Sequence, residues 1–291
     1  MRRISIISIT ACLLAGFAIS AAASEVGPPR GTLVIVGGGI QDLAILTRFI
    51  NLAGGPDAPI VVVPTAGGAR EYDQYWSGLE IFRAAGARNL TVLHTVDRAV
   101  ADSEKFVEPI RKARGVFFWE GRQWHIADSY LDTRTQREFQ AVLDRGGVIG
   151  GSSAGASILG SFLVRGDTRT SDIIMGDHQV GFGFMRNVGI DQHVLVRNRM
   201  FDMISVIEAH PNLLGLGINE NTAIVVQQDE FEVIGHSYVA IYDNQKQIPP
   251  YGRFYFLAPG DRYNLATREA TRPTETRQPV RGNIKKMPWP H

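Results

Sequence analysis

Short apolar runs that end at glycine are the feature of this sequence that most restricts its fold. Residues 32–36 read TLVIV and are closed by Gly37-Gly38-Gly39, and residues 58–63 read APIVVV and are followed by PTAGG. Continuous β-branched runs of this length suit strands that are buried on both faces, whereas half-exposed strands alternate apolar and polar residues. The sequence therefore predicts parallel strands inside a sheet that is covered on both sides.

Stretches with helical character lie between and after these runs. They span residues 42–52, 72–85 and 133–143, and further strands are predicted at residues 91–94, 115–119 and 148–149. Alternation of strand and helix is typical of a parallel sheet with helices on both faces. We therefore expect a single-domain α/β fold with a mainly parallel sheet, and a functional site at the carboxyl ends of its strands.

The N-terminus predicts a leader that is removed on export. Residues 1–3 read MRR, residues 4–19 are largely apolar and residues 20–24 are small, which is the order found in signal peptides. We expect residues 1–23 to be cleaved, a periplasmic or secreted location, and no stable membrane association afterwards. A membrane anchor is the alternative, but the apolar run is short for a span and contains Ser and Thr. A lipid anchor at Cys12 is a minor alternative.

The rest of the chain is expected to form one domain followed by a tail. We see no internal repeat and no low-complexity linker in residues 24–265, so these residues are assigned to a single domain. Residues 266–291 are rich in Arg, Pro and Thr. This composition predicts a tail that is extended over the surface or disordered.

Charge and cysteine content exclude several functions. The chain has 30 basic and 29 acidic residues, so it lacks the basic field that nucleic acid binding requires. Cys12 is the sole cysteine and belongs to the predicted leader, so the mature chain has no disulfide and no thiolate nucleophile. The sequence shows no cluster of metal-ligating residues, and we expect no metal or other cofactor. A hydrolytic nucleophile would have to be an oxygen.

Residues 148–155 (VIGGSSAG) have the order strand, sharp turn and helix that is typical of a nucleophile elbow. A nucleophilic serine at a strained turn needs very small neighbours, because the base and the substrate must both approach it. The pattern predicts Ser153 as the nucleophile. It also predicts that the Ala154 N–H donates to an oxyanion, assisted by the positive end of the helix. Small-residue turns also occur for packing alone, which is the structural alternative.

A serine nucleophile needs a base, and His193 is the strongest candidate among seven histidines. It ends the polar cluster GIDQH, just before a helix that we expect to begin near Val194; capping of that helix is the alternative role. Glu220, in a turn between two apolar runs, is the candidate to orient His193, and a solvated turn carboxylate is its alternative. The order serine, histidine, acid differs from that of α/β-hydrolases and argues against that fold.

Several motifs together resemble the cyanophycinase branch of the dipeptidase E-like serine peptidases, whose fold is similar to that of the class I glutamine amidotransferases, a flavodoxin-like arrangement. They are GGSSAG at 150–155, DQH at 191–193 with two arginines behind it, GINENTA at 217–223 and LAPGD at 257–261. The resemblance spans nearly the whole mature chain. It implies a Ser153, His193 and Glu220 triad that hydrolyses cyanophycin, an aspartate- and arginine-rich polymer, to β-aspartyl-arginine dipeptides through an acyl-enzyme.

The resemblance also implies roles for residues around the triad. Gly121 would supply a second oxyanion N–H. The substrate-binding residues would be Gln123, Asp191, Gln192, Arg197 and Arg199. Arginine forks hold carboxylates with paired hydrogen bonds, and the Asp191 carboxylate could meet a substrate guanidinium. Solvated arginines on a helix are the alternative for Arg197 and Arg199. Family members are often dimers, so the resemblance implies a homodimer.

Two departures from the family pattern bear on the substrate. The family has two glycines and then Asn or Asp before the loop glutamine, whereas this chain has Glu120-Gly121-Arg122. A third arginine is expected three residues after the second, but that position is Asp202. Both changes weaken the cyanophycin prediction more than the triad. They leave open a hydrolase of other aspartyl peptides or isopeptides, and a catalytically silent binding protein of the same fold.

Overall fold

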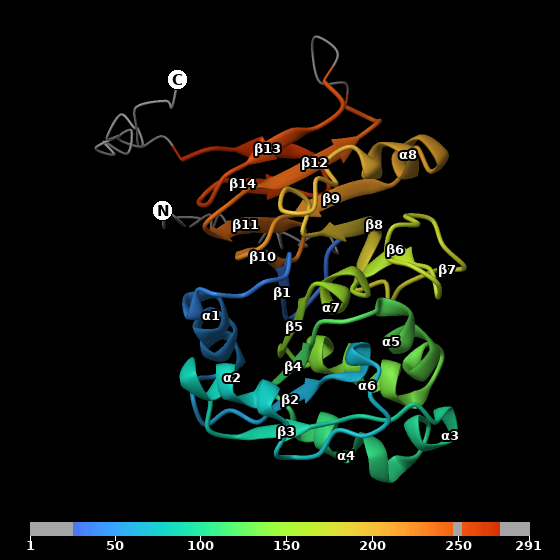
Figure 1. Cartoon of the computed structure of the whole chain (residues 1–291). Helices are drawn as coiled ribbons and strands as arrows, with labels where there is room; N and C mark the ends of the chain where they lie inside the picture. Colours follow the sequence, from blue (N-terminus) through green and yellow to red (C-terminus); the bar gives the residue numbers. More distant parts are fainter. Residues whose placement is uncertain (1–25, 247–251, 274–291) are drawn as a thin grey trace, which may run out of the picture.

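Five parallel strands lie side by side where the sequence has its apolar runs. The structure is a computed structural model that describes residues 26–246 and 252–273, so the predicted leader lies outside the described residues. The strands are β1 (Thr32–Val36), β5 (Val148–Ser152), β4 (Gly115–Phe118), β2 (Ile60–Val63) and β3 (Leu90–Val92), in this spatial order (Figure 1). Their carboxyl ends meet at one edge of the sheet.

Both faces of these strands are buried, which explains why the runs contain almost no polar residues. Leu33 and Ile35 of β1 belong to one apolar cluster, whereas Val34 and Val36 belong to another on the opposite face. Successive side chains of a strand point to opposite faces, so an all-apolar run needs an apolar partner on each side. This arrangement confirms the α/β fold.

Helices form a layer on each side of the strands (Figure 1). One face is covered by α1 (Leu43–Ala53) and α2 (Glu80–Ala84), next to the short 3₁₀ turn η2 (Ser77–Leu79). The other face is covered by α3 (Arg98–Ala101), α4 (Glu104–Lys112), α5 (Gln123–Tyr130), α6 (Arg134–Asp144) and α7 (Ala154–Ser157). A second 3₁₀ turn, η1 (Thr65–Gly67), follows β2. The helices expected at residues 42–52 and 133–143 are confirmed.

The helix predicted for residues 72–85 is wrong for most of its length. The structure has only η2 and α2 there, and residues before Ser77 are irregular. The side chain of Gln74 pairs with the backbone of Val92 in both directions, at 2.8 and 2.9 Å, and so takes the place of a neighbouring strand at the edge of β3. Asp73 accepts from the Tyr75 N–H at 2.8 Å, which favours a turn. These side-chain bonds compete with a helix for the same backbone.

Antiparallel strands extend the larger sheet beyond β1. They are β10 (Thr222–Gln227), β11 (Glu230–Gly235), β14 (Arg262–Asn264) and β15 (Glu269–Thr271). Strand β15 lies within the segment 266–291 that was expected to be an extended or disordered tail, and it pairs with β14. Residues 274–291 of that segment lie outside the described residues. In this larger sheet the parallel arrangement is therefore restricted to the five strands from β1 to the β3 edge.

A second sheet, which the sequence did not reveal, packs against the first. Its strands are β13 (Tyr255–Leu257), β12 (Val239–Asp243), β9 (Leu214–Ile218), β8 (Met185–Gln192), β6 (Gly160–Gly166) and β7 (His178–Val180), in this order, and α8 (Asp202–Ala209) covers β9 and β12. No helix within the described residues is long and apolar enough to cross a membrane.

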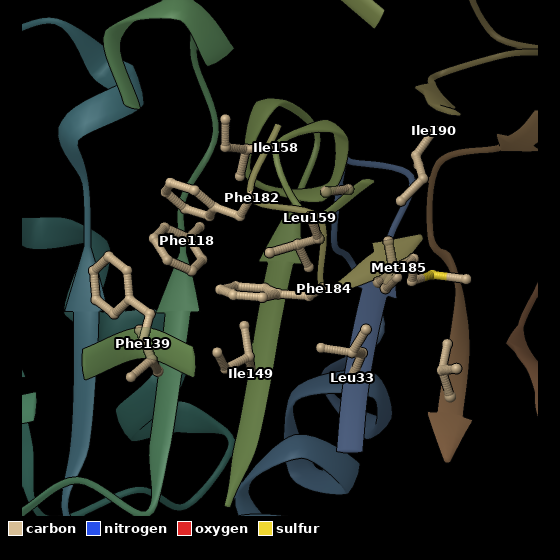
Figure 2. Packing of buried hydrophobic residues seen from close by; sticks show 14 of the residues in the cluster. Leu33, Phe118, Phe139, Ile149, Ile158, Leu159, Phe182, Phe184, Met185 and Ile190 are labelled. Carbon is tan, nitrogen blue, oxygen red and sulfur yellow. The ribbon is translucent and has the colours of Figure 1, made fainter. Parts of the chain in front are cut away.

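A shared apolar core holds the two sheets together. Figure 2 shows Met185 and Ile190 of β8 facing the same interior as Leu33 of β1 and Ile149 of β5, with Phe118 of β4 beside them. All five side chains are completely buried. Burial of apolar surface contributes about 25 cal/mol per Å², so this shared core holds the two sheets together. The ends of these two strands carry the residues of the candidate site.

Candidate active site

The loop after β1 brings three separate segments of the chain to one point. Three consecutive backbone carbonyls each accept a hydrogen bond from one of these segments. The pairs are Ser153 N–H to Val36 at 3.1 Å, His193 N–H to Gly37 at 2.9 Å and Asn221 N–H to Gly38 at 2.9 Å. The backbone of one short loop therefore sets the positions of Ser153, His193 and the residue that follows Glu220.

The side chains of Ser153, His193 and Glu220 form a continuous hydrogen-bonded chain. Ser153 Oγ lies 2.7 Å from His193 Nε2, and His193 Nδ1 lies 2.6 Å from Glu220 Oε1. With its proton on Nδ1, the imidazole donates to the carboxylate and accepts from the serine hydroxyl. A hydroxyl, a base and an orienting acid in this order are the three parts of an activated serine nucleophile.

Backbone strain at Ser153 agrees with a nucleophile elbow. Its φ and ψ are 54° and −113°, which is unusual for a residue with a side chain, and it lies between β5 and α7. The turn requires small neighbours: a Cβ on Gly151 would lie 2.0 Å from the Gly155 carbonyl oxygen, and one on Gly155 would lie 2.1 Å from the Phe118 carbonyl oxygen. Packing therefore explains the glycines on both sides of the serine.

Burial also changes the pKa of His193. Ser153 is 5% exposed and His193 is 3% exposed. Desolvation lowers the pKa of His193 below its ordinary value of 6.5, and the hydrogen bond that His193 donates to Glu220 opposes that change without cancelling it. The imidazole is therefore neutral at pH 7, which is the form that can accept the proton of Ser153.

We expect activity to be lost as the pH falls through the lowered pKa of His193. Protonated imidazole cannot accept the serine proton, so the rate should rise with pH and level off, with a midpoint below 6.5. The measurement is the rate at which a fluorophosphonate labels Ser153 between about pH 4 and 8. A midpoint above 6.5 would show that Glu220 outweighs desolvation.

The two predicted oxyanion donors lie on different elements. Ala154 is the first residue of α7, so its N–H has no acceptor four residues earlier within that helix. Because α7 has only four residues, the expected assistance from a helix dipole is small. Gly121 follows β4 with φ 143°, and a Cβ there would lie 2.1 Å from the Ala66 carbonyl oxygen.

The glycine run after β1 lies directly against the triad. A Cβ on Gly38 would lie 2.2 Å from Cε1 of His193, and one on Gly39 would lie 2.6 Å from Oε2 of Glu220. From the sequence this run is expected to close a strand, and it lacks the residues of a nucleotide-binding motif. Its position at the carboxyl edge of a predicted parallel sheet was the signal that could have linked it to the site.

Substitution of Gly38 by alanine should reduce the labelling rate of Ser153 by about 10²-fold, because the added methyl group displaces the His193 ring. Gly86→Ala is the matched control. Gly86 has φ 106°, similar to 103° at Gly38, but a Cβ there has nothing within 4 Å. Both variants therefore carry the backbone strain, and only Gly38→Ala moves the base. Equal labelling rates for the two variants would contradict this assignment.

The helix predicted after His193 is absent, and residues 193–200 form turns instead. The side chain of Asn219 accepts from the N–H groups of Leu195 and Val196, at 3.0 and 3.2 Å. Asn198 has φ 53°, which ends any helical path, and α8 begins only at Asp202. Asn219 thus satisfies N–H groups that would be left free in the first turn of a helix. Because there is no helix for His193 to cap, the capping interpretation of this residue is wrong.

The predicted substrate-binding residues lie in different environments. Gln123 is buried and its Nε2 donates to the Val164 carbonyl at 2.6 Å. Gln192 is buried beside His193, and its Oε1 accepts from Arg199 Nη1 at 3.0 Å. Arg199 is buried as well, whereas Arg197 is exposed. Neither arginine has a carboxylate partner within the described residues.

Asp191, the fifth of these residues, already has an internal partner. Its carboxylate receives two hydrogen bonds from Arg165, from Nε at 2.7 Å and from Nη2 at 2.9 Å. Arg165 also bonds Asp202 at 2.6 Å and the Ser171 carbonyl at 3.0 Å. Sequence reasoning missed Arg165, although a single charge inside the apolar segment SFLVRG was a signal for a buried ion pair.

No group of three or more His, Cys, Asp or Glu side chains that could hold a metal ion occurs in residues 26–246 and 252–273.

A strained serine at the carboxyl edge of a parallel sheet, bonded to a neutral histidine and an orienting glutamate, defines a serine hydrolase. Comparison with known proteins gives the family. Residues 33–234 match the model of peptidase family S51, so the chain belongs to that family and is a serine-type peptidase.

Named relatives resemble most of the chain. A cyanophycinase of Geminocystis herdmanii (strain PCC 6308) is 33% identical over 265 residues, which cover 82% of this chain and 96% of the relative. A cyanophycinase of Synechococcus elongatus is 31% identical over 82% of this chain and 81% of its own length. The cyanophycinase of Nostoc sp. (strain PCC 7120 / SAG 25.82 / UTEX 2576) is 30% identical over 86% of this chain and 92% of its own.

Solved structures agree with the fold. A peptidase from an acI-B1 Actinobacterium superimposes with a TM-score of 0.62 at 25% identity, covering 81% of this chain and 97% of that one. A putative peptidase E protein from Listeria monocytogenes EGD-e gives a TM-score of 0.53 at 16% identity, over 72% of this chain and 100% of that one, and shows similarity of fold alone.

Proposed function

We propose that this protein is a cyanophycinase-type exopeptidase that hydrolyses multi-arginyl-poly-aspartate to β-aspartyl-arginine dipeptides. The observation that carries the proposal is the hydrogen-bonded chain of Ser153, His193 and Glu220, with distances of 2.7 and 2.6 Å. The choice of substrate is supported by the relatives that are named cyanophycinases, at 30 to 33% identity over most of this chain.

The geometry supports a two-step mechanism through an acyl-enzyme. His193 Nε2 takes the proton of Ser153 as Oγ attacks the scissile carbonyl, and Glu220 stabilises the imidazolium that forms. The N–H groups of Ala154 and Gly121 would donate to the oxyanion of the tetrahedral intermediate. His193 then returns the proton to the leaving amine. Water repeats the sequence on the acyl-enzyme and frees Ser153.

The arginines beside His193 support recognition of an acidic substrate. Arg199 Nη1 is held by the backbone and side-chain oxygens of Gln192, which are neutral acceptors. A guanidinium with no carboxylate among the described residues can still bind one from a substrate. Arg197 contributes a second positive charge four residues after the base. An aspartate-rich chain would supply the carboxylates.

A second candidate function is hydrolysis of aspartyl peptides or isopeptides that carry no arginine. The observation that favours it is the Arg165 guanidinium, which occupies Asp191 with two hydrogen bonds and also bonds Asp202. Asp191 was the residue expected to receive a substrate guanidinium. Because that role is filled from inside the protein, the substrate arginine would add less to binding than the aspartyl carboxylates.

The deciding experiment compares a cyanophycin suspension with soluble aspartyl dipeptides, using the mature chain and its Ser153→Ala variant. Loss of turbidity with release of β-aspartyl-arginine by the wild type alone would support the proposal. Faster turnover of soluble dipeptides than of the polymer would favour the second candidate. Failure of a fluorophosphonate to label folded wild-type protein would favour a binding protein that has kept the fold without activity.

We also propose that the enzyme is exported and acts in the periplasm or the medium. The support is the N-terminal sequence, with its arginines, apolar run and small residues up to Ala23. N-terminal sequencing of protein recovered from periplasmic and culture fractions is the test. A chain that keeps Met1 and remains in the cytoplasm would refute export.

A further inference from the structure

Glu120 is a charged residue beside the nucleophile that the mechanism above does not use. It follows β4 and precedes Gly121, at a position where the resembled family has glycine. Its Oε1 accepts two hydrogen bonds, from the Gly39 N–H at 3.0 Å and from the Ser152 hydroxyl at 2.6 Å. One carboxylate oxygen therefore joins the loops after β1 and β4 to the end of β5.

Each of these three segments carries part of the catalytic apparatus. Gly39 follows Gly38, where an added Cβ would lie 2.2 Å from the His193 ring, and a Cβ on Gly39 itself would lie 2.6 Å from the Glu220 carboxylate. Ser152 directly precedes the nucleophile Ser153. Glu120 itself directly precedes Gly121, the second predicted oxyanion donor. A shift of the Glu120 carboxylate would thus displace the base, the nucleophile and this donor relative to one another.

We propose that Glu120 is a positioning residue of the catalytic centre, whose carboxylate ties the loop that seats His193 to the strand end that carries Ser153. It touches neither Ser153 nor the substrate in this role, and it acts through Gly39 and Ser152. The inference rests on the serine peptidase activity and is independent of which peptide is cleaved. It also explains why this chain tolerates a bulky charged side chain beside its active site.

The charge of Glu120 adds an effect that packing alone would not produce. The charged groups that act on His193 come from three loops: Glu220 from the turn after β9, Arg197 from the turn after β8, and Glu120 from the loop after β4. Glu120 raises the pKa of His193, in the same direction as Glu220, while desolvation and Arg197 lower it. Removal of the negative charge therefore lowers the pKa of the base.

Two substitutions separate the contribution of the hydrogen bonds from that of the charge. Glu120→Gln keeps an oxygen that can accept from Gly39 and Ser152 but removes the charge, whereas Glu120→Ala removes both. The readout is the rate at which a fluorophosphonate labels Ser153 as a function of pH, with Ser153→Ala as the blank. Glu71→Gln, at an exposed carboxylate on another loop, is the control for an altered net charge.

We expect Glu120→Gln to label at nearly the wild-type rate on the plateau, with the acid midpoint moved to lower pH. Glu120→Ala should label on the order of 10²-fold more slowly at every pH, because the loops are no longer joined. Glu71→Gln should leave the plateau and the midpoint unchanged. An unmoved midpoint in Glu120→Gln, or a wild-type plateau rate in Glu120→Ala, would overturn the proposal. Because the probe is not a peptide, neither result depends on the substrate.

Discussion

Replacement of Ser153 by alanine is expected to reduce peptide hydrolysis by roughly 10⁴- to 10⁶-fold, the range found when a triad nucleophile is removed. The reason is that Ser153 Oγ is the atom bonded to His193 Nε2, at 2.7 Å, and no covalent intermediate can form without it. The measurement is single-turnover hydrolysis of whichever aspartyl peptide the wild type cleaves. The residual rate should come from the oxyanion donors and substrate binding alone.

Ser77→Ala is the matched control for this substitution, since Ser77 is an exposed serine in η2, distant from Ser153 in the sequence. It should retain wild-type activity. The thermal unfolding of Ser153→Ala should also stay near that of the wild type or rise slightly, because the residue has a strained backbone and the removed hydroxyl serves catalysis. Retention of more than a tenth of the activity in Ser153→Ala would mean that another group is the nucleophile.

Replacement of Arg165 by methionine is expected to lower the free energy of unfolding by about 3–5 kcal/mol, the cost of leaving a buried charge without its partner. Both side chains of the Arg165–Asp191 pair are 1% exposed, so water cannot replace the guanidinium. Asp202 would lose the same partner, but its side chain is 41% exposed and can be solvated. Urea unfolding followed by circular dichroism measures the change.

Two comparisons identify the cause of that loss. Arg83→Met breaks an exposed ion pair with Glu80, with side chains 45% and 69% exposed, and should cost no more than about 1 kcal/mol. In the double variant Arg165→Met with Asp191→Asn, the unpaired charge is also removed, so the loss should be smaller than the sum of the single variants. A cost below about 1 kcal/mol for Arg165→Met alone would refute the buried ion pair.

The segments of the fold that could be predicted from the sequence are those whose conformation is determined by the residues of the segment itself. After Thr32 the run Thr32–Val36 has only apolar residues, and burial on both faces of a sheet accommodates it. By contrast, most of the helix expected at residues 72–85 does not form, because the side-chain amide of Gln74 makes hydrogen bonds to the backbone of β3 instead. That partner lies 18 residues away in the chain, and hydrophobic periodicity carries no information about it.

The residues of the candidate site also include some that could be predicted from the sequence and some that could not. The small residues around Ser153 indicated an elbow because a strained turn excludes side chains, and this requirement is written in the sequence itself. The sheet edge could have placed the glycine run near the site, but the bonds from Ser153, His193 and Asn221 to the carbonyls of Val36, Gly37 and Gly38 could not be foreseen, because backbone hydrogen bonds do not depend on side-chain identity. The partners of Glu120 could not be foreseen either, because Gly39 follows β1 and Ser152 ends β5, both far from Glu120 in the chain.

The sequence by itself therefore determined the buried parallel strands, the elbow at Ser153, and the family pattern of Ser153, His193 and Glu220. Only the tertiary structure decided which charges near the site are free and which are neutralised. Asp191 and Asp202 were candidates for binding or repelling substrate, and Arg165 of β6 engages both. The physical reason is that an ion pair depends on distance in space, and β6 and β8 become neighbours only when they pair within the second sheet.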